Sequence, residues 1–485
     1  MTNAQYLWTV GDICAATNGQ PTDGTATTKA DSTITGISID SREIKAGDLF
    51  VALPGAVSDG HKFLAAAQSA GASAALVSKI DRTLDLPQIC VSDCLSALRQ
   101  LGVTGRARFG GIQFGITGSV GKTGSKDMLA HTLANFGKIH ASQRSYNNQI
   151  GVPLTLSNLP VDCDFAVQEM GMNSAGEIAS LTTIARPDVA MITRVASTHR
   201  EFFDAMEDIA AAKAEIFQGL QHGGIAVLNL DDPFFLQLEM AAIKEGAGRT
   251  ITFGRHNKAE FRLLEAGQHD SGMSVRSEIM GHELTFEMQM HGSHWAQNAL
   301  GVLACVDALG LDLEIAASSL STCQTPKGRG TRISGHYQHC AVTVIDDSYN
   351  ASPASMTAAF ASMKATPPKI MILSEMRELG KGTTPEHDAL MPQINALSPR
   401  VVIALGPAMH AAISGLDSSI AGIAAADTCA AIEIFDNVIE DGDIVFIKGS
   451  LGSGSWQVRD AILSKLTVRP SPDTPSFNGG NSHAA

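Results

Sequence analysis

The residues with the clearest chemistry lie in one run, FGITGSVGKTGSKDML, at positions 114–129. An apolar, strand-like segment leads into it and a helical pattern follows. Its polyphosphate-binding groups are Gly118, Ser119, Gly121, Lys122 and Thr123. Glycines let backbone N–H groups surround phosphates, a lysine reaches the outer phosphates, and a threonine hydroxyl holds Mg²⁺. The start of the helix adds partial positive charge. The run predicts a nucleotide triphosphate site with Mg²⁺.

This phosphate loop departs from the usual spacing. Ile116 stands where the pattern has its first glycine, and glycines occupy positions 115 and 118 instead. A glycine-rich turn between a strand and a helix, without any ligand, is the alternative interpretation. The Gly-Lys-Thr triplet directly after an apolar strand favours the triphosphate site.

Polar residues follow the next apolar strands of the same region. Glu169 follows FAVQ, His199 follows MITRVAST, and Asn229 and Asp231 end GIAVLNLD. In parallel sheets, ligands bind beyond the carboxyl ends of the strands. A buried histidine or a helix-capping aspartate would explain any one of these residues alone. Their common position beside a phosphate loop instead predicts nucleotide and metal binding, with Thr123 and Glu169 holding Mg²⁺ and His199 a second ion.

The strand and helix patterns predict an α/β protein of three domains. At about 150 residues per domain, 485 residues accommodate about three. We expect a small α/β domain over residues 1–107, a central, mostly parallel sheet domain with the phosphate loop over 108–330, and a Rossmann-like doubly wound domain over 331–467. Residues 468–485 have the composition of a disordered tail.

Two smaller segments have distinct patterns. The glycine-rich, basic stretch 101–111 is interpreted as a linker, and the alternation over 255–291 predicts a small antiparallel meander.

Composition limits the classes of function. The net charge of −14 argues against a nucleic-acid-binding surface, which needs a basic face. No apolar run is long enough to span a membrane, and the first residues lack the pattern of a signal peptide. The eight cysteines are scattered without a C-x-x-C pair, which is typical of reduced, buried thiols in a cytosolic protein. We expect a cytoplasmic monomer that acts on small molecules.

Four further motifs carry a family resemblance: NNQIGVPLTL, EMGMNSAGEI, AKAEIF and DDSYNASPASM. With the phosphate loop, they make the chain resemble the Mur ligases of peptidoglycan synthesis over nearly its whole length. DDSYNASP is the most specific motif, because sister ligases carry other residues there. It points to ATP-dependent joining of D-alanyl-D-alanine to UDP-N-acetylmuramoyl-tripeptide through an acyl phosphate.

The resemblance implies roles for individual residues. In the first two domains it assigns UDP to Ser41 and Arg42, the muramoyl substrate to Asn147 and Asn148, and adenine to His294 and Asn298. Asn229 is expected at the nucleotide from its place at a strand end alone. Lys213 matches a lysine that is carbamylated in many members and then resembles a carboxylate ligand; from the sequence alone, a solvated helix lysine is the commoner explanation. Beyond these, it assigns an ATP phosphate to Arg329, the ribose and γ-phosphate to Asp347, and the incoming dipeptide to Ser348, Tyr349 and Asn350.

Departures from the family pattern leave alternatives open. Arg200 replaces an apolar residue, Gly124-Ser125 replaces threonine, Ser374-Glu375-Met376 stands for Gly-Asp-Met, and LGSGSWQV after Lys448-Gly449-Ser450 is unusual. These changes weaken the assignment of dipeptide contacts in the third domain. A sister ligase with another amino-acid substrate, or a nucleotide-binding regulatory module without catalysis, are the alternatives.

Overall fold

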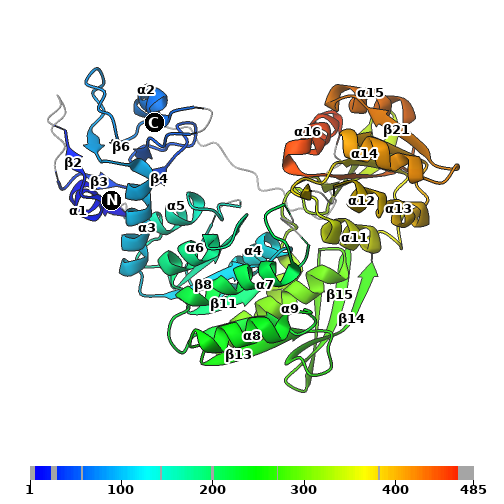
Figure 1. Cartoon of the computed structure of the whole chain (residues 1–485), viewed down its shortest axis with the longest axis horizontal. Coiled ribbons are helices and arrows are strands. Elements are labelled where there is room, and N and C mark those ends of the chain that lie inside the picture. The colour runs from blue at the N-terminus through cyan, green and yellow to red at the C-terminus, as the bar shows by residue number, and fades with distance from the viewer. Residues whose placement is uncertain are drawn as a thin grey trace, which may run out of the picture. The chain divides into compact units, whose positions relative to one another are not determined.

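The computed structural model describes residues 6–22, 30–55, 58–142, 145–197, 201–269, 271–380 and 383–467. The chain divides into two compact units, Met1–Gln324 and Thr325–Ala485. We describe each unit separately. Figure 1 shows the α/β architecture of both.

The first unit begins with a small sheet. Its five strands follow the order β2-β7-β6-β5-β4, with bounds β2 (Gln20–Pro21), β4 (Ile37–Ser38), β5 (Leu49–Val51), β6 (Ala74–Val77) and β7 (Gln88–Cys90). A separate two-stranded ribbon joins β1 (Trp8–Thr9) and β3 (Thr33–Ile34). The helices here are α1 (Val10–Thr17), α2 (Leu64–Ser69) and α3 (Cys94–Arg108). A capping box, in which Thr9 and Asp12 bond each other's backbone N–H, starts α1.

The linker predicted over residues 101–111 is wrong. Most of it is the second half of α3, whose glycines face α5 (Gly151–Ser157). A Cβ at Gly102 would collide with the backbone of Pro153, and one at Gly105 with that of Leu156. The glycines therefore permit close helix packing here.

The larger sheet of the first unit has nine strands in the order β16-β15-β14-β13-β12-β11-β8-β10-β9. The strands from β9 to β14 pair in parallel, and β14, β15 and β16 form the predicted antiparallel meander. Their bounds are β8 (Ile112–Thr117), β9 (Ile139–Ala141), β10 (Phe165–Glu169), β11 (Val189–Ile192), β12 (Ile225–Asn229), β13 (Arg249–Gly254), β14 (Phe261–His269), β15 (Gly272–Ile279) and β16 (His282–Met288).

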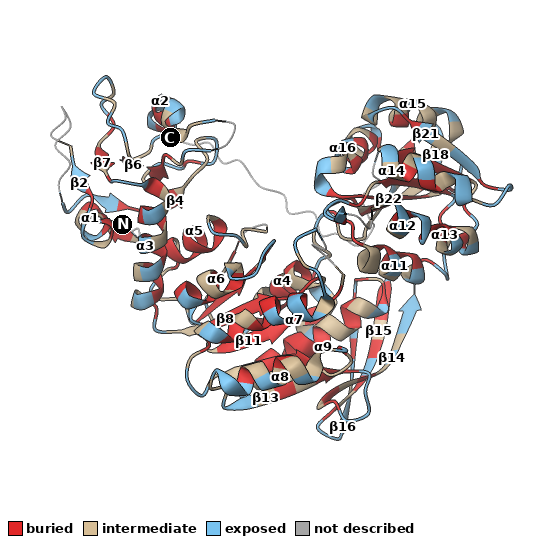
Figure 2. Cartoon of the chain, viewed as in Figure 1, coloured by how far each residue is buried: buried red, intermediate tan, exposed pale blue. Residues whose placement is uncertain are grey.

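Helices cover both faces of this sheet, because its parallel strands bury side chains on both sides. Val189 and Met191 of β11 join the core under α4 (Lys122–Leu133), α9 (Ser293–Asp307) and α10 (Leu313–Ser319). Ala190 and Ile192 join the opposite core with α5, α6 (Glu177–Ala185), α7 (Met206–Ala214) and α8 (Phe235–Lys244). The buried strands between helices with exposed outer faces are visible in Figure 2.

The second unit is a doubly wound α/β domain, as predicted. Its six-stranded sheet has the order β17-β18-β22-β19-β20-β21 and is parallel from β18 to β21. The strands are β17 (Thr331–Tyr337), β18 (Cys340–Asp347), β19 (Ile370–Ser374), β20 (Val401–Leu405), β21 (Ala421–Ala425) and β22 (Ile444–Lys448). The helices are α11 (Pro353–Ser362), α12 (Thr383–Asp388), α13 (Met391–Leu397), α14 (Pro407–Ala412), α15 (Thr428–Val438) and α16 (Ser455–Lys465).

Strand order in this unit brings three chain segments to one edge. Because β22 lies between β18 and β19 and all three are parallel, the segments after Asp347, Lys448 and Ser374 leave the sheet side by side. Ser352 caps α11 and Pro353 occupies its first turn.

Candidate active site

The phosphate loop connects β8 to α4, as the sequence predicts. Gly118 has φ 148° and Gly121 has φ 86°, conformations that glycine adopts without strain. A Cβ at Gly118 would collide with the Thr193 hydroxyl, which donates to the carbonyl of Val120 at 2.6 Å. Thr193 follows β11 directly, so the neighbouring strand holds the loop in place.

The loop side chains divide into a structural group and a group suited to a ligand. The Ser119 hydroxyl donates to Ala196 O at 2.9 Å and is used within the protein. Lys122 Nζ folds back to donate to Gly118 O at 2.6 Å. Thr123 lies in the first turn of α4, with its hydroxyl 3.4 Å from that of Ser145. Lys122 and Thr123 begin α4 and are the loop side chains suited to a ligand.

Glu169 ends β10 beside the phosphate loop, since it pairs in register with Ile116 of β8. Its side chain is 1% exposed. Oε1 accepts a hydrogen bond from Asn147 Nδ2 at 2.7 Å, whereas the buried Oε2 has no protein partner. A buried carboxylate oxygen without a partner is costly unless a ligand completes it. Asn147, expected at the substrate, orients this carboxylate.

Lys213 on α7 is fully buried, and its Nζ has no hydrogen-bond partner. Burial lowers the pKa of this amine well below its ordinary value, and the nearby Lys122 charge lowers it further, against the opposing charges of Glu215 and Glu169. The commoner interpretation of Lys213 as a solvated helix lysine is wrong. The structure instead buries this amine within electrostatic range of Lys122 and Glu169.

Three other expected residues surround the loop. Asn298 on α9 lies against Gly121, where a Cβ would be 2.7 Å from its Nδ2. His294 lies in the first turn of the same helix, and its ring centroid is 5.6 Å from that of Trp295. Trp295 itself packs over Gly124. Asn229 is more internal, because its side chain donates to Thr193 O at 3.2 Å and accepts from the backbone N–H of Asp231 at 2.9 Å.

The remaining predicted residues of the first unit lie elsewhere. Asn148 accepts hydrogen bonds from the backbone N–H groups of Ile150 and Gly151 and so shapes the turn before α5. Arg42 is exposed and forms a paired contact with Asp40, while Ser41 lies beside it after β4. His199 lies outside the described residues.

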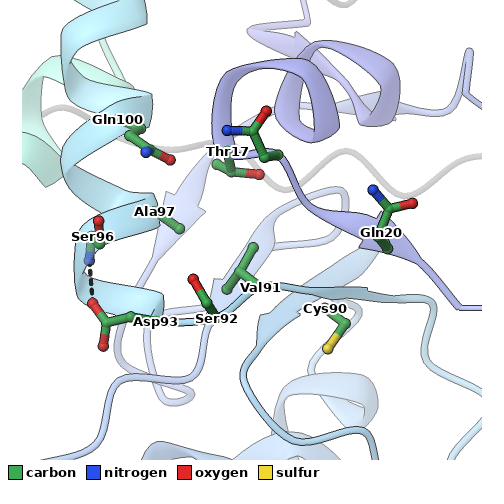
Figure 3. Close-up of a pocket in the computed structure, with 10 residues that line it drawn as sticks. Thr17, Gln20, Cys90, Val91, Ser92, Asp93, Ser96, Ala97 and Gln100 are labelled. Atoms are coloured by element: carbon green, nitrogen blue, oxygen red, sulfur yellow. Dashed lines mark hydrogen bonds between the residues drawn. The ribbon is translucent and has the colours of Figure 1, made fainter.

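A separate cavity of about 420 Å³ lies in the small N-terminal sheet region. Figure 3 shows its lining from the ends of α1 and β7 and the start of α3. Two of its polar groups serve the surrounding helices: Asp93 caps α3 by accepting from the Ser96 N–H at 2.6 Å, and the Thr17 hydroxyl donates to Ile13 O at 2.7 Å. The cavity contains none of the predicted site residues, and we assign no function to it.

The predicted residues of the second unit gather around the end of β18. Asp347 accepts from Lys448 Nζ at 2.7 Å, and burial raises the pKa of this carboxyl against the pull of Lys448. The Arg329 guanidinium stacks 4.5 Å from the centroid of the Tyr349 ring. The fully buried Ser348 donates to Asp346 Oδ1 at 2.6 Å. The Asn350 side chain accepts from the Ala351 N–H at 2.8 Å.

Sequence reasoning missed some supporting residues. Thr193 and Lys448 each end or follow an apolar strand, so the rule that singled out Glu169 would have found them. Trp295 lies one residue from His294 but carries no signal of its own. Among the described residues, no group of three His, Cys, Asp or Glu side chains forms a ready metal cluster. No helix of the described chain is long and apolar enough to cross a membrane.

Family models match three parts of the chain. The Mur ligase family catalytic domain covers residues 33–97, the Mur ligase middle domain 116–306, and the Mur ligase glutamate ligase domain 328–451. A UDP-N-acetylmuramoyl-tripeptide–D-alanyl-D-alanine ligase of Synechocystis is 32% identical, covering 89% of this chain and 92% of the relative. The chain belongs to the Mur ligase family. An Escherichia coli ligase of the same name is 30% identical, with 90% and 96% covered.

Solved structures of Mur ligases agree with this membership. MurF from Acinetobacter baumannii has a TM-score of 0.81 at 27% identity, covering 94% of this chain and 99% of that one. MurF ligase from Thermotoga maritima, in complex with ADP, has a TM-score of 0.73 at 25% identity, with 89% and 97% covered. The expected Mur ligase resemblance and three-domain α/β architecture are confirmed.

Proposed function

We propose that this protein is an ATP-dependent ligase that joins D-alanyl-D-alanine to UDP-N-acetylmuramoyl-tripeptide. The observation that carries the proposal is the combination of Lys122, Glu169 and a fully buried Lys213 at one edge of the central sheet. Two of these groups keep a buried polar atom without a protein partner, which a bound ligand would complete. The proposed substrates are those given in the names of the relatives.

The residues at the loop fit Mg²⁺ together with ATP. Mg²⁺ takes oxygen ligands and often only one or two from the protein, with phosphates and waters supplying the rest. Glu169 Oε2 is a buried oxygen without a partner, and the Thr123 hydroxyl lies in the first turn of α4. These two residues would hold the ion, with His199 at a second one. Bound Mg²⁺ would neutralise phosphate charge.

The chain's own residues would contribute position and charge. The tripeptide carboxylate attacks the γ-phosphorus of ATP, and the bond from that phosphorus to the β-phosphate oxygen breaks. ADP departs, and the tripeptide becomes an acyl phosphate. The dipeptide amine then attacks the carbonyl carbon, forms the amide, loses a proton and releases phosphate. Phosphate-loop N–H groups and Lys122 would stabilise the transferring phosphoryl group, since such reactions depend mainly on positioning and charge.

Lys213 has the properties of a carbamylation site. A neutral amine attacks the carbon of CO₂ and loses a proton, which gives a carbamate with two oxygens. Lys213 meets the first requirement because burial favours its neutral form. We expect Lys213→Ala to lose activity and short carboxylic acids, such as formate, to restore part of it. Full activity of Lys213→Ala without any additive would contradict this role.

The other predicted residues have supporting positions in this proposal. Ser41 and Arg42 would meet the UDP group, Asn147 and Asn148 the muramoyl side, and Asn229, His294 and Asn298 the nucleotide. In the second unit, Arg329 and Asp347 would contact ATP, and Ser348, Tyr349 and Asn350 the dipeptide. The protein would act as a monomer in the cytoplasm, where ATP and the nucleotide-linked precursor are available.

The test is ligation by the purified full chain. ATP, Mg²⁺, the UDP-muramoyl tripeptide and D-alanyl-D-alanine should give phosphate and a product heavier by the dipeptide less one water, measured by mass spectrometry. Phosphate release no greater than with ATP alone would contradict the proposal. Parallel reactions with single amino acids as acceptors separate it from a sister ligase activity.

A further inference from the structure

The two unusual segments of the second unit contact each other. Ser374, at the end of β19, lies with its hydroxyl 2.6 Å from that of Ser453 in the turn after β22. Ser374 is fully buried, and Gly449 leaves the space that its hydroxyl fills, since a Cβ there would collide with it. The two departures from the family pattern therefore form a single feature at the carboxyl edge of the sheet.

Further bonds fix the geometry of this edge. The Ser450 hydroxyl is within 3.0 Å of the Arg377 backbone N–H, from which it accepts, and the Ser450 N–H donates to Glu375 O at 3.4 Å. Ser453 Oγ donates to Ser450 O at 2.5 Å. Hydrogen bonds thus join residues 374–377 to residues 449–453, and they fix the position of the Arg377 backbone.

The Arg377 guanidinium lies directly over Gly452. A Cβ at position 452 would collide with Arg377 Nη1 and lie 2.9 Å from its Cζ. Gly452 does not have a left-handed backbone conformation, so its lack of a side chain serves this close approach rather than a turn. Glycine at 452 therefore provides the space that the guanidinium occupies.

Arg377 differs from the other arginines at or near this sheet. Arg459 pairs with Asp346, Arg400 pairs with Glu440 and Asp443, and Arg329 stacks on Tyr349. Within the described residues of this unit, no carboxylate forms an ion pair with Arg377, although it is exposed in a chain of net charge −14. The Arg377 guanidinium has several N–H donors, a fixed backbone position and no acidic partner, and it is therefore suited to a carboxylate ligand.

We infer that Arg377, seated over Gly452, binds the terminal carboxylate of the acceptor dipeptide. The inference rests on the proposed ligase function, in which the acceptor carries an amine at one end and a carboxylate at the other. The amine must reach the acyl phosphate, so the carboxylate at the other end of the dipeptide needs a separate receptor. Ligands of doubly wound sheets bind beyond the carboxyl ends of the strands, which is where Arg377 and Gly452 meet.

The test compares D-alanyl-D-alanine with its C-terminal amide in the ligation assay. Arg377→Ala should raise KM for the dipeptide about 10- to 100-fold, the range expected for losing a charge-assisted pair, and leave KM for ATP unchanged. KM for the amide should already be high and should not change in the variant. Arg377→Lys should give an intermediate KM.

Gly452→Ala is the second variant, because its methyl displaces the guanidinium while Arg377 remains in the chain. It should raise KM for the dipeptide and not for the amide. Lys369→Ala, an exposed lysine at the opposite end of β19, is the matched control and should change neither KM.

Three outcomes decide the inference. A selective loss for the free carboxylate in both variants supports it. Equal changes for dipeptide and amide, or Arg377→Ala behaving like Lys369→Ala while the native enzyme ligates normally, overturn it and leave the proposed function standing. No ligation by the native enzyme overturns both.

Discussion

The central sheet and the sheet of the second unit differ in the polar groups that lie at the carboxyl ends of their strands. At the central edge, Glu169 Oε2 and Lys213 Nζ are buried without protein partners. At the other edge, Asp347 pairs with Lys448, Asp346 with Arg459, and Ser374 with Ser453. Buried polar groups are normally satisfied, so two orphaned ionisable groups beside one phosphate loop fit a site that a ligand completes. The satisfied edge is a scaffold that presents few free groups, with Arg377 the notable one.

Arg459→Met breaks the scaffold side of this comparison and should have the largest effect. Arg459 Nη1 bonds Asp346 Oδ2 at 2.5 Å, and Asp346 is 1% exposed. Removing Arg459 leaves the buried Asp346 carboxylate without a counter-charge, which costs about 3–5 kcal/mol. Urea unfolding should show this loss in the second unit. A change below about 1 kcal/mol would mean that Asp346 is solvated or neutral, and the two edges would not differ as described.

Lys122→Ala tests the ligand-binding side. Loss of one preorganised donor to a transferring phosphoryl group should reduce kcat by about 10²-fold or more. Steady-state phosphate release at saturating substrates measures it. Lys138→Ala is the control, because Lys138 is an exposed lysine of the same unit paired with Asp162. Near-native turnover in Lys122→Ala would remove the phosphate loop from the mechanism.

Asn147 and Asn148 are neighbours with different contacts, and they sharpen the comparison within one loop. Asn147 orients the Glu169 carboxylate, so Asn147→Ala should raise the Mg²⁺ concentration for half-maximal activity about 10- to 100-fold. The Asn148 side chain instead accepts from the backbone N–H groups of Ile150 and Gly151, so Asn148→Ala should cost about 1 kcal/mol of stability and leave the Mg²⁺ requirement unchanged. Identical Mg²⁺ titrations for the two variants would contradict the role of Asn147.

Lys213 should make stability depend on pH. Burial lowers its pKa in the folded protein, so unfolding takes up a proton between that pKa and the ordinary one. Stability therefore rises with pH through this window, by about 1.4 kcal/mol for each pH unit. In bicarbonate-free buffer, Lys213→Met should be more stable than the native chain at pH 7, with the gap narrowing toward pH 10. Urea midpoints measure this, and a gap independent of pH would show that Lys213 is not a buried neutral amine.

Local patterns predicted most of the fold and part of the site. The strand preceding Gly118, the helix after Lys122 and the position of Glu169 all depend on short-range alternation and on one rule about strand ends. The linker prediction failed because glycines in α3 serve packing against α5, a contact between segments about 50 residues apart in sequence.

The missed features share that physical cause. The Ser374–Ser453 bond and the seat of Arg377 over Gly452 join segments that only the strand order of the second unit brings together. The burial of Lys213 depends on tertiary packing around α7, and no pattern in AKAEIF reveals it. The sequence showed Ser374 and Gly452 only as parts of departures from the family pattern, and without the family resemblance it favoured a solvated lysine at position 213.

The central claim is that ATP phosphates bind at the edge of the central sheet, beside Lys122, Glu169 and Lys213. A crystal structure of the full chain with Mg²⁺ and a non-hydrolysable ATP analogue tests it most directly. The account predicts β- and γ-phosphate oxygens within hydrogen-bond distance of the backbone N–H groups of residues 118–123 and of Lys122 Nζ, with Mg²⁺ on Glu169. A nucleotide bound elsewhere, or phosphates on the loop with Glu169 and Lys213 remote from them, would contradict it.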